Sequence, residues 1–142
     1  MIAPQIRNLT GGEIFEIAVV DDYSRVYREV VDRARQELRN GVKPALKNEL
    51  KSLPYYKTVF IGYPNWCNTF PAPVSTFLSE NDFAGKTIIP FCTHGGGGAG
   101  YSFADIRKQC PTSEVLDGFT INGYAVSRNN PEIEEWLKKL EA

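Results

Sequence analysis

Two runs of apolar and β-branched residues constrain the fold most, "KTVFIGY" at 57–63 and "KTIIPFC" at 86–92. Neither run alternates between apolar and polar positions, and this is the pattern of a strand covered on both faces in a parallel sheet. Each run is followed by an unusual loop and then by a helical pattern. Because strands that alternate with helices form mostly parallel sheets covered by helices on both faces, we expect an α/β domain.

Four strand patterns and five helix patterns are expected along the chain. The remaining strands are predicted at 13–20, "EIFEIAVV", and at 114–121, "EVLDGFTI". The helix from Asp22 to Asn40 carries one broad apolar stripe and ends at Gly41. The last helix is expected to begin at Asn130 as N-cap, with Trp136 in its apolar stripe. The other helices are predicted at 2–9, 72–80 and 102–110.

Length and charge place limits on the class of protein. A chain of 142 residues fits a single domain, 1–142, with one core. The 16 basic and 17 acidic residues give a net charge of −1 with no basic stripe, so we expect no nucleic-acid partner. No apolar run is long enough to span a bilayer, and residues 1–12 lack a secretory pattern. The three widely spaced cysteines, with no C-x-x-C, favour a reducing compartment, and we expect the cytoplasm.

The loops after the two central strands are the candidate functional segments. In parallel α/β sheets ligands bind beyond the carboxyl ends of the strands, and adjacent strands would bring the two loops together. In the first loop, "GYPNWCNTFPAP" at 62–73, three prolines stiffen the backbone and Trp66 is expected at the tip. Trp66 either packs locally as a core side chain or forms a rigid platform for a planar ligand.

The second loop contains five glycines, at 95–98 and at 100. Glycine lets backbone N–H and C=O groups approach a ligand closely. The loop has no G-x-G-x-x-G with a following acidic residue and no G-K-[ST], so a phosphate cradle is not indicated. The edge of a heterocyclic ring fits this loop better.

A different chemistry would use Cys67 and His94, which lie in the two facing loops and could form a thiolate–imidazole pair. The simpler interpretation, which we favour, makes Cys67 a small filler and His94 a hydrogen-bonding loop residue. The sequence identifies no third group that would orient the histidine.

The chain resembles the flavodoxins, in particular the short single-domain flavodoxin-like proteins of bacteria. The matching stretches are "TGGEIFEI", "FIGYPNWCNTFPAPVSTFL", "GKTIIPFCTHGGGGAGYSFADIRKQCP" and "VLDGFTI", which cover most of residues 10–121. The resemblance implies a three-layer flavodoxin-like sandwich with strand order 2-1-3-4-5 that carries one FMN. It also implies a protein of electron transfer, or a small flavin-dependent oxidoreductase, which uses no acid–base side chain.

The resemblance assigns roles to the two loops. An aromatic at the position of Trp66 packs on one face of the isoalloxazine, and Tyr101 would cover the other. Backbone groups of the second loop hold the pyrimidine edge and N5 of the ring. The implied partners are a redox protein or a small electron acceptor. The implied cofactor-binding residues are Pro64, Asn65, Trp66, Cys67, Asn68, Thr69, Thr93, His94, Gly95, Gly96, Gly97 and Gly98.

The chain departs from this family at several points. Cys67 stands where many relatives have an aromatic or a glycine, and the near-neutral charge differs from that of acidic flavodoxins. The largest departure is that residues 2–12 match the helix that follows the first family strand and the phosphate-binding loop. Without that loop, at least three decades of FMN affinity are expected to be lost.

Three explanations of that departure remain open. The start may be misplaced, a strand may be exchanged between subunits of a homodimer or replaced by direct strand pairing, or the protein may have lost FMN. The last explanation gives the alternative function, a cofactor-free binding or assembly module on the same scaffold.

Overall fold

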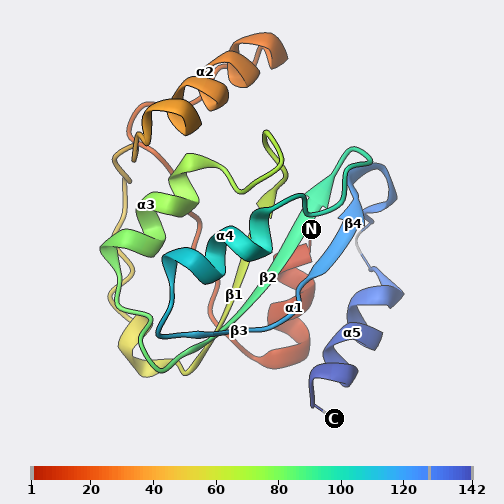
Figure 1. Ribbon diagram of the computed structural model, residues 1–142. Coiled ribbons are helices and arrows are strands. Elements are labelled where there is room, and N and C mark those ends of the chain that lie inside the picture. The colour runs from red at the N-terminus through yellow and green to blue at the C-terminus, as the bar shows by residue number, and fades with distance from the viewer. Residues whose placement is uncertain (1, 128, 142) are drawn as a thin grey trace.

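The computed structural model describes residues 2–127 and 129–141 and has the three-layer α/β architecture that the sequence predicts (Figure 1). The helices are α1 (Ile2–Thr10), α2 (Tyr27–Asn40), α3 (Ala72–Glu80), α4 (Ser102–Gln109) and α5 (Pro131–Glu141). The strands are β1 (Thr58–Pro64), β2 (Thr87–His94), β3 (Glu114–Val115) and β4 (Phe119–Asn122), and short 3₁₀ turns lie at Leu53–Tyr55 and Gly123–Ala125.

The sheet is parallel and is built around β2. β1 pairs with β2 over its full length, from Thr58 opposite Thr87 to Pro64 opposite Thr93. β3 and β4 pair with the other edge of β2. This order matches the last three positions of the expected 2-1-3-4-5 arrangement.

The strand predicted at 114–121 is divided into β3 and β4 by a one-residue bulge. Glu114 lies opposite Thr87, and Phe119 lies opposite Phe91. The five residue steps from Glu114 to Phe119 therefore lie beside only four steps of β2. The physical reason is Pro90 in the middle of β2, which has no N–H to donate to the sheet. Gly118 fits against this point, since a Cβ there would lie 2.2 Å from the Pro90 carbonyl oxygen.

The strand predicted at 13–20 is wrong. This segment is extended, but its one bridge is an antiparallel contact between Val19 and Leu46. Phe15 and Ile17 still pack against the core. The apolar, β-branched residues of this segment therefore indicate partial burial correctly. They do not make it a strand, because a strand also needs a neighbouring strand to pair with.

The predicted helix at 22–40 is confirmed from Tyr27 onward, and Gly41 ends it in the left-handed conformation, with φ 63°. The predicted apolar face does not pack into the core. Among the described residues of α2 only Glu37 is buried, and Leu38 is 55% exposed. Figure 1 shows α2 projecting from the body of the molecule above α3.

Two apolar clusters lie on opposite faces of the sheet. One is formed with α3 and α4 and includes Phe77 and Ile106, and the other is formed with α1 and α5 and includes Ile6 and Ile133. The buried Asn130, at the start of α5 as predicted, joins α5 to α1: its backbone N–H donates to Gln5 Oε1 at 2.9 Å, and its carbonyl accepts from Gln5 Nε2 at 2.8 Å. In the part of the chain that the structure describes, no helix is long and apolar enough to cross a membrane.

Gly118→Ala should lower the free energy of unfolding by about 1–3 kcal/mol, because the added methyl group meets the Pro90 carbonyl and the Phe103 ring. Gly12→Ala is the control, since its Cβ would meet nothing closer than 3.6 Å. Urea titration of both variants measures the difference. Equal stability of the two would contradict the close fit at the bulge.

Candidate functional site at the carboxyl edge of the sheet

The first candidate loop folds into a tight hairpin after β1. The Trp66 N–H donates to the Thr69 carbonyl at 2.9 Å, and the Thr69 N–H donates to the Trp66 carbonyl at 3.1 Å. Cys67 and Asn68 between them have φ values of 55° and 67°. Two successive positive φ values define a type I′ turn. The tip is therefore Cys67–Asn68, not Trp66 as expected, and Trp66 lies at the base of the hairpin.

The two candidate loops lie directly against each other, as the sequence predicts. The Asn65 N–H donates to the Thr93 carbonyl at 2.8 Å, and Asn65 Nδ2 donates to the Gly98 carbonyl at 2.9 Å. The Tyr101 N–H donates to the Asn68 carbonyl at 2.6 Å. A Cβ on Gly100 would lie 2.4 Å from that carbonyl oxygen. This glycine is thus needed for packing between the loops rather than for a ligand.

The other glycines of the second loop have open surroundings. A Cβ added to Gly95, Gly96 or Gly98 would meet no atom within 4 Å. Gly96 and Gly98 have φ values of 136° and 66°, so side chains are disfavoured there even though space exists. This stretch can therefore present its peptide groups to a ligand at van der Waals distance.

Asn65 carries an unpaired polar atom at the junction of the loops. Its Oδ1 is buried and has no hydrogen-bond partner among the described residues. Leaving a buried acceptor unsatisfied costs about 1–3 kcal/mol. Because Nδ2 is bonded to Gly98, the amide orientation is set, and Oδ1 remains an acceptor that an N–H donor of a ligand would satisfy.

Trp66 is half-buried and does not belong to either core cluster. Tyr23 packs edge-on against its indole, with ring centroids 5.0 Å apart at 69°. Trp136, in contrast, packs against Phe60 and Phe119 in the core, as predicted. Trp66 therefore lies outside both core clusters and packs locally against Tyr23, and its expected role as a platform for a planar ligand stays a prediction.

Sequence reasoning missed Tyr23, whose own contacts hold it in place. Arg33 lies over the Tyr23 ring, 3.8 Å from its centroid, and its Nε bonds Glu37 at 3.2 Å. The Tyr23 hydroxyl donates to Glu37. Burial and this carboxylate raise the pKa of Tyr23, which keeps its hydroxyl protonated. The i, i+4 spacing of Arg33 and Glu37 was visible in the sequence, but their contact with Tyr23 was not.

Hydrogen bonds between polar side chains connect β1 and the hairpin to α4. The Tyr63 hydroxyl donates to Ser102 Oγ at 2.9 Å, and Thr69 Oγ1 donates to Asp105 Oδ2 at 2.5 Å. Ser102 and Asp105 are in the first turn of α4, so these bonds fix the hairpin and β1 to that helix. The sequence gave no sign of either bond beyond polar residues at a helix start.

The Cys67–His94 pair finds no support as a catalytic unit. The Gly96 N–H donates to His94 Nδ1 at 3.0 Å, which makes that nitrogen an acceptor. Within residues 2–127 and 129–141, no hydrogen bond joins His94 to Cys67 or to a carboxylate. His94 is accordingly a loop hydrogen-bonder, as the favoured interpretation has it. Tyr101 is 72% exposed, and its expected contact with a ring stays a prediction.

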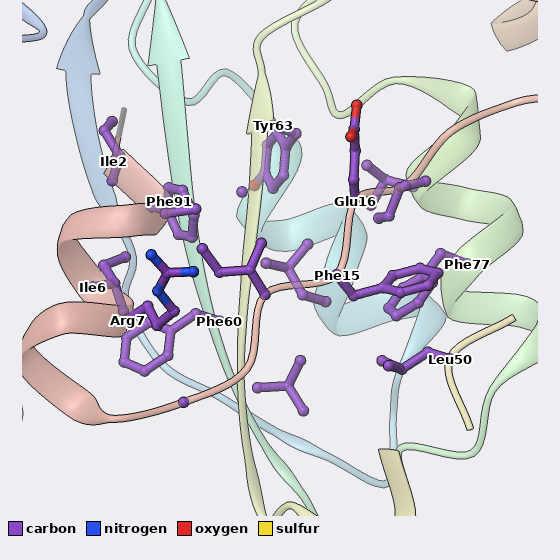
Figure 2. A pocket seen from close by; sticks show the side chains of 18 of the residues that line it. Ile2, Ile6, Arg7, Phe15, Glu16, Leu50, Phe60, Tyr63, Phe77 and Phe91 are labelled. Atoms are coloured by element: carbon purple, nitrogen blue, oxygen red, sulfur yellow. The ribbon is translucent and has the colours of Figure 1, made fainter. Parts of the chain in front are cut away.

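A large apolar trough opens beneath this edge, along β1 (Figure 2). Its volume is about 1280 Å³, and it reaches from Trp66 and Thr93 down to Leu53. Figure 2 shows Ile2, Ile6 and Arg7 on the α1 side, and Phe15, Leu50 and Phe77 on the α3 side. The described residues contain no cluster of metal-ligating side chains in the trough or elsewhere.

A parallel α/β sandwich whose two loops meet beyond the carboxyl ends of β1 and β2 defines the flavodoxin-like class of fold. The sequence matches the flavodoxin family over residues 1–140, and the chain belongs to that family.

Three solved structures have a similar fold. A candidate flavoprotein from Bacteroides eggerthii superposes with a TM-score of 0.85 at 27% identity, covering 99% of this chain and 89% of that one. A candidate flavoprotein from Bacteroides uniformis superposes with a TM-score of 0.84 at 30% identity, covering 96% of this chain and 88% of that one. A Lactobacillus acidophilus flavoprotein in complex with FMN shares the fold, with a TM-score of 0.75 at 16% identity and coverage of 96% and 88%. No curated protein sequence was found to match.

Native protein at pH 8 should react with a thiol reagent at Cys67 alone. Cys67 is exposed, whereas Cys92 and Cys110 are buried. Burial raises the pKa of the Cys92 thiol to about 11 and also raises that of Cys110, so neither forms the reactive thiolate at pH 8. Mass spectrometry after labelling locates the modified residue. All three should react in denaturant, and native labelling of Cys92 at the rate of Cys67 would contradict the burial.

Tyr23→Ala should change the environment of Trp66, because it removes the ring that packs against the indole. Fluorine NMR of protein containing fluorotryptophan resolves the two indoles, and the Trp66 signal should shift while that of Trp136 stays. Tyr27→Ala is the matched control, since Tyr27 is 83% exposed. An unmoved Trp66 signal would remove Tyr23 from the site.

Proposed function

We propose that the protein binds FMN, with the isoalloxazine ring seated where the hairpin and the glycine loop meet. The observation that carries the proposal is the direct bonding of these two loops through Asn65 and Asn68, which joins the hairpin that contains Trp66 to the glycine loop. Membership of the flavodoxin family supports the same assignment.

Different groups of the chain would contact different parts of the ring. The indole of Trp66 would be the stacking surface, and Tyr23 packs edge-on against it. The peptide groups of Gly95, Gly96 and Gly98 would hold the ring edge, since a Cβ at these positions meets no atom within 4 Å. Asn65 Oδ1 would accept from a ring N–H, which would remove the cost of its unpaired state. FMN, when bound, supplies reversible one- and two-electron chemistry, so no acid–base side chain is required.

Fewer groups of the described residues are available to bind the phosphate of FMN than to bind its ring. The first turn of α1 begins Ile-Ala-Pro and offers neither a hydroxyl nor a cation, although its N-terminal dipole favours an anion.

An electron-transfer protein or a small flavin-dependent oxidoreductase is the role that fits this site. The partner would be a redox protein or a small electron acceptor that reaches the ring at the sheet edge, and we place the protein in the cytoplasm. The alternative is a cofactor-free binding module on the same scaffold.

Titration with FMN and with riboflavin tests the assignment, with quenching of tryptophan and flavin fluorescence as the readout. Trp66→Ala should weaken flavin binding by about 1–3 kcal/mol, the usual contribution of stacking on an aromatic side chain. Tyr124→Ala is the control, because Tyr124 is 96% exposed and lies outside the two loops. Cys67→Ser should bind flavin as the parent does.

Two outcomes would count against the proposal. Absence of flavin binding at any accessible concentration favours the cofactor-free module. Flavin binding that Trp66→Ala leaves unchanged moves the ring away from the junction of the loops. Loss of binding in Cys67→Ser would instead bring the cysteine into the site.

A further inference from the structure

The outer surface of α2 carries an apolar stripe whose two ends are open to solvent. Its residues follow one another at intervals of four, three and four positions, namely Tyr27, Val31, Ala34 and Leu38. On a helix this spacing places them in one narrow row. Tyr27 and Leu38 are exposed, and the two residues between them are half-buried. Figure 1 shows that the helix projects from the body of the molecule above α3, so the row is accessible to a partner.

A row of arginines borders this stripe on one side. Arg28, Arg35 and Arg39 each directly follow a residue of the stripe, so they lie along the same flank of it. All three are exposed, and within the described residues none of them forms an ion pair. The same row holds one acidic residue, Asp32. This flank of α2 therefore presents a net positive charge to solvent.

The other flank of the stripe faces the rest of the molecule. There Glu37 is buried, bonds Arg33 at 3.2 Å and accepts from the Tyr23 hydroxyl. Glu29, in the first turn, accepts from the Ser24 hydroxyl. These two acids are thus engaged and do not neutralise the row of arginines. The same contacts hold α2 as a formed helix before anything binds, which lowers the ordering cost of association.

The shape of the stripe indicates an α-helix as its occupant. Apolar residues at alternating intervals of four and three form the seam along which two helices pack side by side, and charges beside the seam select the partner. A helix that lies on a bilayer surface needs a broader apolar face with large residues such as Trp, Phe and Leu. The stripe of α2 is one residue wide, and Leu38 is its one leucine.

We propose that the outer surface of α2 is a docking site for an amphipathic α-helix of a partner protein, with apolar residues along the seam of that helix and Asp or Glu beside them. The apolar residues would pack between Tyr27 and Leu38. The acidic side chains would pair with Arg28, Arg35 and Arg39. Charge complementarity with this row is the reason for an acidic partner.

A second copy of this chain fits the surface less well. Among the described residues of the other helices, Leu9 is the one large apolar side chain that is exposed, so they offer no matching stripe. Two copies of α2 packed antiparallel would bring Arg28 of one copy near Arg35 of the other, and like charges beside a seam oppose pairing. A parallel pair would bring the arginine row against the flank that the body of the molecule occupies.

Two synthetic helical peptides of about three heptads test the seam and the charge together. Both carry Leu along the seam. One has Glu and the other has Lys at every flanking position, so that each repels its own copies. Fluorescence anisotropy of the labelled peptides measures binding to the flavin-free protein. The Glu peptide should bind, its affinity should fall by about tenfold between ~50 mM and ~500 mM salt, and the Lys peptide should bind at least about tenfold more weakly.

Two variants of the chain locate the binding surface. Arg35→Glu and Leu38→Gln should each weaken binding of the Glu peptide by about tenfold or more, because one reverses a flanking charge and the other removes an apolar seam residue. Lys139→Glu is the matched control, since it makes the same charge change at an exposed position of α5. Circular dichroism checks that each variant keeps its helices. Equal binding of the two peptides, or unchanged binding in Arg35→Glu, would overturn the inference.

A different occupant would also overturn it. If the Glu peptide fails to bind and vesicles containing anionic lipid bind the parent but not Arg35→Glu, the surface belongs to a membrane. If the Glu peptide fails to bind and the protein forms a dimer that Leu38→Gln abolishes, the surface belongs to a second copy. No binding in any of these assays leaves α2 without a docking role. None of the readouts involves flavin, so the inference and the proposed function can fail separately.

Discussion

The parallel pairing of β1 with β2 is the interaction on which the rest of the structure depends. Its register sets Pro64 opposite Thr93, so both strands end at the same level and their loops leave the sheet side by side. Because the two strands end at the same level, Asn65 can form hydrogen bonds with both Thr93 and Gly98. A shift by one residue would turn Tyr63 away from Ser102 and separate the hairpin from the glycine loop. The candidate site is therefore a consequence of strand register as much as of its own residues.

The two loops meet, but they use their residues differently from what their composition alone suggests. Gly100 is needed where backbone meets backbone, and Cys67 occupies a left-handed position that glycine or asparagine fills more easily. The residues that we propose face a ligand are fewer: the indole of Trp66, one amide oxygen and a short run of glycine peptides. This small set suits a flat heterocycle, since it offers a surface and an edge but no charge.

Sequence reasoning recovered the elements whose signals are local. The apolar runs predicted β1 and β2, the residues Gly41 and Asn130 marked two helix ends, and the strand order brought the proline and glycine loops together. It failed where structure depends on a distant partner. Within the described residues, the segment at 13–20 has the composition of a strand but no strand to pair with. The contacts of Tyr23 with Arg33 and Glu37 join a residue outside the helix to residues within it, which no sequence period predicts. The break between β3 and β4 had a visible sign in Pro90, since proline is rare in a central strand.

The projection of α2 has a consequence for how such a protein can change over evolutionary time. Its one buried residue, Glu37, is bonded to Tyr23 and Arg33, and the helix also touches α3. An arm with so few contacts to the core can lengthen, shorten or acquire new surface chemistry without disturbing the sheet. We expect that lineages of this family diverge most in that arm while the sheet stays the same.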